Sequence, residues 1–228
     1  MLSRIVVTTS TPCAHIERIA MEFDVPVTIN PERRGIGSDW NFGLAQASSR
    51  FVTLAHQDDL YVPEFLARSL DLFARHPQIS LTFTNYQEIS DDGTPRSSKI
   101  SFVKDTLLAV FAGRREIIQG GRGRMLLSFG NPISCSSVTI DREKLGSFRF
   151  SEELSSNLDW EAWLDLLEGG RAFAYCPLRL VERRYNDLTE TRQAIRDGRR
   201  RAEDHRIFAR LWPRPIARAM LAVYATGY

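Results

Sequence analysis

The sequence contains little lysine, little cysteine and no long apolar segment. Lysine occurs only at positions 99, 104 and 144, although lysine and arginine together number 30, so almost every positive charge is a guanidinium. This group favours planar, bidentate pairing with phosphate or carboxylate. The three cysteines, Cys13, Cys135 and Cys176, are far apart and form no CxxC pair, which indicates free thiols in a reducing compartment. No apolar run could span a bilayer and no apolar leader stands at the N-terminus, so we expect a cytoplasmic protein.

Length and net charge set the next limits. A chain of 228 residues is long enough for one large domain or two small ones. We expect a main domain over residues 1–188 and a helical extension over residues 189–228, which is rich in arginine. The formal charge of +2 is too close to neutral to indicate a polyanionic partner by itself, and we expect no nucleic acid.

Short β-branched segments alternate with helical patterns in the first 90 residues. The expected strands are residues 4–9, 25–30, 51–54 and 79–86. The expected helices are residues 10–23, residues 38–47 with Ser38 as N-cap, and residues 63–76. This alternation predicts an α/β fold with a mixed, mainly parallel sheet flanked by helices.

The strand expected over residues 51–54 is apolar, as if buried on both faces, and it leads into His56, Gln57, Asp58 and Asp59. In an open α/β sheet, ligands bind outside the carboxyl ends of the strands, where these four side chains would lie. Carboxylates suit Mn²⁺ or Mg²⁺, and such an ion could hold a diphosphate there. The alternative is that Asp58 or Asp59 only caps the helix that begins at Pro63.

The second half of the chain is less regular. Residues 120–124 have the composition of a flexible basic loop, which we interpret as a solvated connector rather than a phosphate-contacting lid. Asn157 is expected to cap a helix over residues 158–168, with Asp159 in its first turn and outside its apolar stripe. Short strands are expected over residues 173–175 and 178–181, followed by Arg183 and Arg184.

Three segments together resemble the motifs of the family 2 glycosyltransferases, which have the GT-A fold. Residues 35–63 resemble the family's N-x-G-x-A helix and the strand that ends in a D-x-D-D metal motif, with His56 at the first acidic position. Residues 146–163 resemble its acceptor-side segment, with Leu158 in place of a glutamate and Asp159 at the position of the catalytic base. Residues 184–191 resemble its R-x-H-x-x-S-x-T segment, with Asn186 in place of histidine.

The resemblance implies a GT-A-like domain over residues 1–188 that takes a sugar from a nucleotide-sugar donor to an acceptor hydroxyl with inversion. The acceptor would be a glycan or a lipid-linked molecule, as in cell-envelope polysaccharide synthesis. Mn²⁺ or Mg²⁺ would be held by Asp58 and His56, and Asp159 would take the proton of the acceptor hydroxyl. The other residues expected at the donor are Asn41, Gln57, Asp59, Arg183 and Arg184. For Arg183 and Arg184, pairing with Glu182 or Asp187 is an equal alternative.

Two departures from the family affect the expected sheet. The family's first strand and helix would precede residue 4, and its acidic turn is replaced here by residues 8–12, Thr-Thr-Ser-Thr-Pro. We therefore expect the strands over residues 4–9 and 51–54 to pair directly, because this costs less chain entropy than recruiting another strand. Such pairing would narrow the pocket for the nucleotide base and weaken donor binding.

Two other functions remain open. One is a degenerate GT-A domain that binds a glycan or a nucleotide without turnover. The other is a protein that docks on a membrane surface, or less readily on RNA, through the arginine-rich C-terminal helix. Glu203 and Asp204 interrupt the basic run 199–201, and Ile207, Phe208 and Leu211 could pack on the main domain instead.

Overall fold

The computed structural model describes residues 4–113, 115–185 and 190–226. The strands are β1 (Val7–Thr9), β2 (Val27–Ile29), β3 (Phe51–Thr53), β4 (Leu60–Tyr61), β5 (Leu81–Ile89), β6 (Pro95–Arg96), β7 (Ile117–Ile118), β8 (Val138–Asp141) and β9 (Phe173–Arg184). The helices are α1 (Ala14–Glu22), α2 (Ile36–Gln46), α3 (Phe65–Arg75), α4 (Lys99–Phe111), α5 (Gly120–Leu127), α6 (Arg142–Leu145), α7 (Leu158–Glu168), α8 (Glu190–Arg196), α9 (Arg199–Leu211) and α10 (Arg214–Ala225), with a 3₁₀ turn at Cys135–Ser137.

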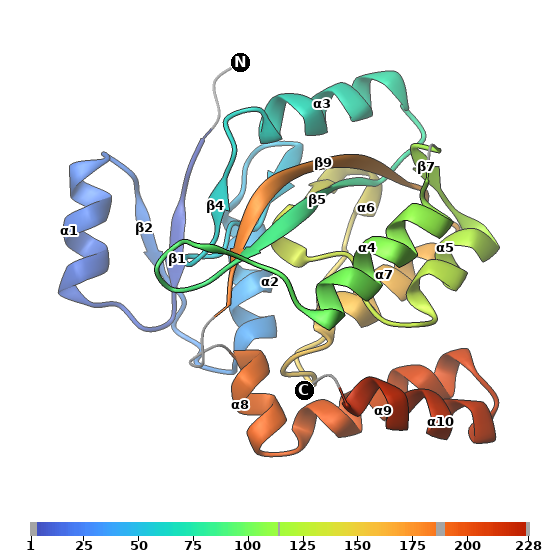
Figure 1. Cartoon of the computed structure of the whole chain (residues 1–228). Coiled ribbons are helices and arrows are strands. Elements are labelled where there is room, and N and C mark those ends of the chain that lie inside the picture. Colours follow the sequence, from blue (N-terminus) through green and yellow to red (C-terminus); the bar gives the residue numbers. More distant parts are fainter. Residues whose placement is uncertain (1–3, 114, 186–189, 227–228) are drawn as a thin grey trace.

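The main sheet has seven strands in the order β3-β8-β5-β9-β4, with β6 beside β5 and β7 beside β9. Its longest pairing is parallel and joins β5 to β9, whereas β8 runs antiparallel to both β3 and β5. In Figure 1, α3 lies on one side of the sheet and α4, α5 and α7 lie on the other. The expected mixed α/β sheet flanked by helices is confirmed.

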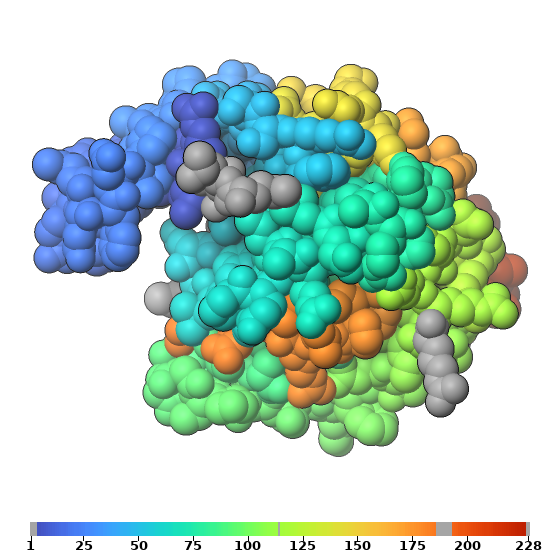
Figure 2. Space-filling model, turned by 90° about the horizontal axis from the view of Figure 1, so that it is seen from above, coloured from blue at the N-terminus to red at the C-terminus, as the bar shows by residue number. Residues whose placement is uncertain are grey.

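The direct pairing expected between the first strand and residues 51–54 is wrong. Among the described residues β1 pairs only with β2, in parallel, while β3 pairs only with β8 and is a half-buried edge strand rather than a fully buried one. Helix α2 bridges the two sheets, because Gly43 approaches both Thr8 and Leu54 so closely that an added Cβ would lie 3.2 and 3.5 Å from their side chains. Figure 2 shows the N-terminal segments as a lobe set apart from the main body.

The two faces of the sheet pack into separate clusters. On one face, Phe65, Leu72 and Phe73 of α3 lie against Ala174 and Cys176. On the other face, the fully buried Trp160 and Trp163 of α7 lie in a cluster with Phe83, Phe173 and Tyr175. Alternate residues of β9 therefore serve opposite faces, as strand geometry requires.

The C-terminal helices join the larger of these clusters. Ile207, Phe208 and Leu211 of α9, with Ala217 and Leu221 of α10, are buried beside the tryptophans of α7. The expectation that Ile207, Phe208 and Leu211 pack on the main domain is confirmed, and the domain boundary at residue 188 stays a prediction. No helix in the described part of the chain is long and apolar enough to cross a bilayer.

Three local expectations are corrected. Helix α2 begins after Gly35, whose φ of 99° favours glycine, so Ser38 lies inside the helix and does not cap it. Residues 120–124 form the start of α5 rather than a loop, because Gly123 lets this helix pack closely on Leu167 of α7. The two short strands expected near residue 176 are one strand, β9, whose register shift accommodates Pro177.

Candidate functional site

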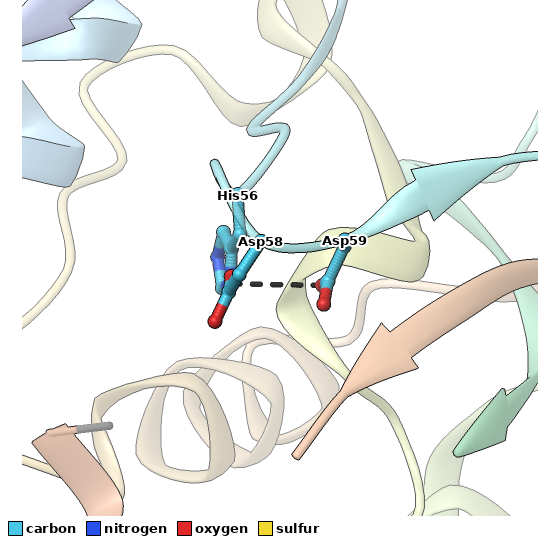
Figure 3. Close-up of side chains that lie close together, drawn as sticks. All are labelled: His56, Asp58 and Asp59. Atoms are coloured by element: carbon cyan, nitrogen blue, oxygen red, sulfur yellow. Dashed lines mark ion pairs between the residues drawn. The ribbon is translucent and has the colours of Figure 1, made fainter. Parts of the chain in front are cut away.

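The carboxylates and imidazole that follow β3 form a compact cluster. The chain leaves β3 at Thr53, turns through residues 54–59 and enters β4 at Leu60. Ligand atoms of His56, Asp58 and Asp59 all lie within 4.8 Å of one another, and Nδ1 of His56 is 3.9 Å from Oδ2 of Asp59. Figure 3 shows the three side chains projecting to the same side of this turn.

Two atoms of this cluster are buried without a hydrogen-bond partner among the described residues: Nε2 of His56 and Oδ2 of Asp59. Burying a polar atom without a partner costs free energy, so the presence of two such atoms in one cluster is a reason to expect a ligand. Burial lowers the pKa of His56, more than the nearby carboxylates raise it, which keeps the imidazole neutral and able to bind a metal. Two carboxylates and one neutral imidazole therefore fit Mn²⁺ or Mg²⁺.

The capping alternative for Asp58 and Asp59 is excluded. Helix α3 begins at Phe65 with Glu64 as its N-cap residue, and β4 separates it from the acidic pair. Asp59 instead accepts a 3.0 Å hydrogen bond from the backbone N–H of Arg184, at the end of β9. The acidic turn is thereby tied to the centre of the sheet.

The two arginines at the end of β9 have different environments. The Arg184 guanidinium donates to the backbone oxygens of Asp58, Ser90 and Asp91, at 3.2, 2.9 and 2.6 Å. The Arg184 guanidinium therefore links the turn at Asp58 to the loop at Ser90 and Asp91. Asp187, which the sequence offers as an alternative partner of these arginines, lies outside the described residues, as does Asn186.

The guanidinium of Arg183 has no hydrogen bond or ion pair with any residue that the structure describes. Burial lowers its pKa, but Tyr86 and the carboxylates of Asp59, Glu88 and Asp159 raise it by more. The guanidinium therefore lies within the electrostatic reach of both acidic groups of the candidate site. Of the two arginines, Arg183 is the one available to an anionic ligand.

Asp159 is the second residue of α7. Its Oδ1 accepts a 2.8 Å hydrogen bond from the backbone N–H of Trp160. Burial raises the pKa of the carboxyl, and the charges of Arg200, Lys104 and Arg183 reduce this rise without cancelling it. A raised pKa makes a carboxylate a better proton acceptor near neutral pH, provided that it is ionised.

Asn41 and Gln57 are the two remaining residues that the sequence predicts at the donor. Asn41 is 5% exposed, and its amide both donates to the Phe150 oxygen at 3.0 Å and accepts from the Phe150 N–H at 2.8 Å. A further bond runs from its Nδ2 to Glu152 at 3.1 Å. A donor would have to displace these bonds, so the surroundings of Asn41 favour a structural role. Gln57 is exposed beside His56.

Sequence reasoning missed two cations around Asp159, which are Lys104 of α4 and Arg200 of α9. Lys104 donates a 3.0 Å hydrogen bond to the hydroxyl of Tyr86 on β5. Arg200 pairs with Asp204 at 3.2 Å and is nearly buried. The rarity of lysine could have drawn attention to Lys104, whereas Arg200, which faces inward, is hidden among many neighbouring arginines.

The family model described as "Glycosyl transferase family 2" matches residues 9–140, which is more than half of the chain. The chain belongs to glycosyl transferase family 2. The matched segment contains α2, β3, the whole acidic cluster and the central strand β5, and it ends within β8. No curated protein sequence matches this family 2 chain.

Solved structures of other glycosyltransferases share the fold. TarS 1–349 of S. aureus, in complex with UDP-GlcNAc, matches with a TM-score of 0.63 at 14% identity, over 97% of this chain and 62% of that one. The mannosyltransferase PcManGT from Pyrobaculum calidifontis, with GDP-Man and Mn²⁺, gives 0.60 at 16% identity, over 97% and 59%.

Glucosyl-3-phosphoglycerate synthase from Mycobacterium tuberculosis, with Mn²⁺ and UDP-glucose, gives a TM-score of 0.55 at 19% identity, over 83% of this chain and 64% of that one. The family 2 chain therefore spans less than two thirds of the length of each of these proteins.

Proposed function

We propose that this chain transfers a sugar from a nucleotide-sugar donor to an acceptor hydroxyl, with inversion and with dependence on a divalent metal. The observation that carries the proposal is the arrangement of two acidic groups around the guanidinium of Arg183, which has no partner among the described residues. The cluster of His56, Asp58 and Asp59 has two atoms without a partner among the described residues, Asp159 has a raised pKa, and Arg183 interacts electrostatically with Asp59 and Asp159.

The donor side rests on the acidic turn. His56 and Asp58 would hold Mn²⁺ or Mg²⁺, which when bound neutralises charge on the leaving diphosphate. Asp59, tied to the Arg184 backbone, keeps the turn in place. The guanidinium of Arg183 contributes two planar donors to the same diphosphate, where it binds the leaving group and orients the sugar.

The acceptor side rests on Asp159. Its carboxylate accepts the proton of the acceptor hydroxyl, so that the oxygen attacks the anomeric carbon as the bond to the diphosphate breaks. Attack by this oxygen from the face opposite the diphosphate would invert the anomeric configuration, as the family resemblance implies. TarS and PcManGT, solved in complex with UDP-GlcNAc and GDP-Man, support a nucleotide-sugar donor.

The C-terminal helix α10 supports a peripheral membrane contact, which would suit a lipid-linked acceptor at the cytoplasmic face. Ile216 and Val223 are exposed on this helix, together with the cationic Arg214 and Arg218. RNA is disfavoured, because arginines of α9 already pair with carboxylates of α7: Arg206 pairs with Glu161 at 3.0 Å and Arg210 with Asp165 at 2.6 Å.

A donor screen tests the proposed function. Purified chain is incubated with UDP-GlcNAc, UDP-glucose or GDP-mannose, with Mn²⁺ or with EDTA, and release of the nucleoside diphosphate is measured. Mn²⁺-dependent release from at least one donor supports the proposal. Tight donor binding without any release would support the degenerate, non-catalytic alternative instead.

A further inference from the structure

Helix α9 places two adjacent acidic residues beneath the start of α7. Glu203 is 8% exposed and Asp204 is fully buried, although both stand in an arginine-rich segment. In Figure 1 the C-terminal helices lie below α7, on the side away from α3. Buried acids need strong partners, because an unpaired buried charge is costly.

Glu203 finds its partners in the three residues that precede α7. It accepts hydrogen bonds from the backbone N–H groups of Ser155, Ser156 and Asn157, at 2.7, 3.0 and 3.0 Å. The hydroxyls of Ser155 and Ser156 donate to the same carboxylate at 2.8 and 2.7 Å. Five donors on one carboxylate fix this short loop more firmly than backbone bonds alone would.

Asp204 holds the next residue. The side chain of Asn157 donates a 2.7 Å hydrogen bond to Oδ1 of Asp204 and makes no capping bond to α7, although Asn157 occupies the N-cap position. The same Oδ1 accepts from Arg200 at 3.2 Å. The charge of Arg200 also acts on Asp159, which lies only two residues beyond Asn157.

We propose that Glu203 is a positioning residue for Asp159, and that α9 fixes the first turn of α7 so that the carboxylate meets the acceptor hydroxyl. This inference rests on the proposed function, in which Asp159 is the base. It assigns the acidic pair of the C-terminal extension a role in transfer, which its sequence context does not indicate. Displacement of a base by about 1 Å is enough to cost roughly 100-fold in rate.

The test compares Glu203→Gln with wild type and with a matched control. In the glutamine variant an NH₂ group replaces one of the two acceptor oxygens. This group cannot accept the hydrogen bonds that the N–H groups of the loop donate. Asp141→Asn is the control, because Asp141 is also fully buried and accepts from backbone N–H groups, at Glu143 and Lys144, but belongs to the β8–α6 junction. Both variants should lower the melting temperature.

The rate separates the two variants. With the donor that wild type hydrolyses fastest among UDP-GlcNAc, UDP-glucose and GDP-mannose, Glu203→Gln should lower kcat by about 10- to 100-fold and leave the donor KM within about twofold. Asp141→Asn should leave kcat unchanged. In an Asp159→Asn background, Glu203→Gln should cause no further loss, since the residue it positions is gone.

Each result decides the proposal. An unchanged kcat in Glu203→Gln, or an equal loss with and without Asp159, overturns the positioning role while the proposed function stands. Full activity of Asp159→Asn contradicts the assigned base, and the positioning role falls with it. Release of nucleoside diphosphate from none of the three donors by wild type contradicts the proposed function itself.

Discussion

The backbone N–H of Arg184 donates a 3.0 Å hydrogen bond to Oδ1 of Asp59. These two residues are 125 positions apart in the chain, and their bond joins the end of β9 to the acidic turn after β3. The neighbouring residue, Arg183, is thereby brought to the same turn, and its guanidinium has no partner in the part of the chain that the structure describes. One backbone contact thus aligns the candidate metal cluster with the candidate phosphate ligand, and the predictions below test the parts of this arrangement separately.

Asp58→Ala should abolish Mn²⁺-dependent donor binding with little loss of stability, because the Asp58 side chain makes no hydrogen bond among the described residues and is only half-buried. Asp59→Ala is the control. Its side chain is 2% exposed and holds the Arg184 N–H, so its loss should reduce the free energy of unfolding by about 1–3 kcal/mol. Calorimetric titration and chemical denaturation measure the two effects. Donor binding by Asp58→Ala equal to that of wild type would refute the metal assignment.

Arg183→Gln and Arg184→Gln form a matched pair of neighbouring substitutions. The first should weaken donor binding by about 10-fold or more and leave stability unchanged, because it removes a charge-assisted donor that holds no other described residue. The second should lower stability by about 1–3 kcal/mol, because backbone oxygens of residues 58, 90 and 91 each lose the hydrogen bond that Arg184 donates. If the two variants show the reverse pattern, Arg183 is not the phosphate ligand.

The pH profile should report on Asp159. Burial raises its pKa, and only the ionised carboxylate can act as a base, so kcat should fall toward acid pH through this raised value. Arg200 opposes the rise, while Lys104 and Arg183 act in the same sense as Arg200. Arg200→Gln should therefore move the acid limb of the kcat profile to higher pH. A limb that stays in place or moves to lower pH would show that Asp159 does not control it.

The close contact between α5 and α7 can be tested by stability alone. Gly123→Ala should reduce the free energy of unfolding by about 1–3 kcal/mol, because the new Cβ would lie 2.6 Å from Cδ2 of the buried Leu167. Gly121→Ala, two residues earlier in the same helix, meets no atom within 4 Å and should be neutral or stabilising by up to about 1 kcal/mol. Equal effects in urea denaturation would contradict the packing.

The elements that sequence reasoning predicted well are those determined by local pattern. The end of β3 with its acidic turn, and α7 between Asn157 and Gly169, have strong periodicity and clear boundary residues. The continuity of β9 was missed because Pro177 usually ends a strand, and only the register of β5 shows that the ladder tolerates it there. The separation of β1 from β3 was missed because strand pairing depends on which distant segments meet, which no local pattern encodes.

The candidate site was predictable to a similar extent. Asp58, His56 and Asp159 could be selected because each stands at the end of an element, next to a recognisable motif. Glu203 could not, because two acids in an arginine run are typical of a solvated helix face. Only the tertiary contact with residues 155–157 shows that Glu203 faces inward, and the inward direction of Arg200 follows from the same contact.

The measurement that tests the central claim most directly is the turnover of Asp159→Asn beside that of wild type, with donor affinity measured on the same samples. The account predicts that kcat falls by about 10²- to 10⁴-fold while the donor dissociation constant is nearly unchanged, because the general base acts on the acceptor and does not hold the donor. Normal turnover in Asp159→Asn, accompanied only by a lower melting temperature, would contradict it.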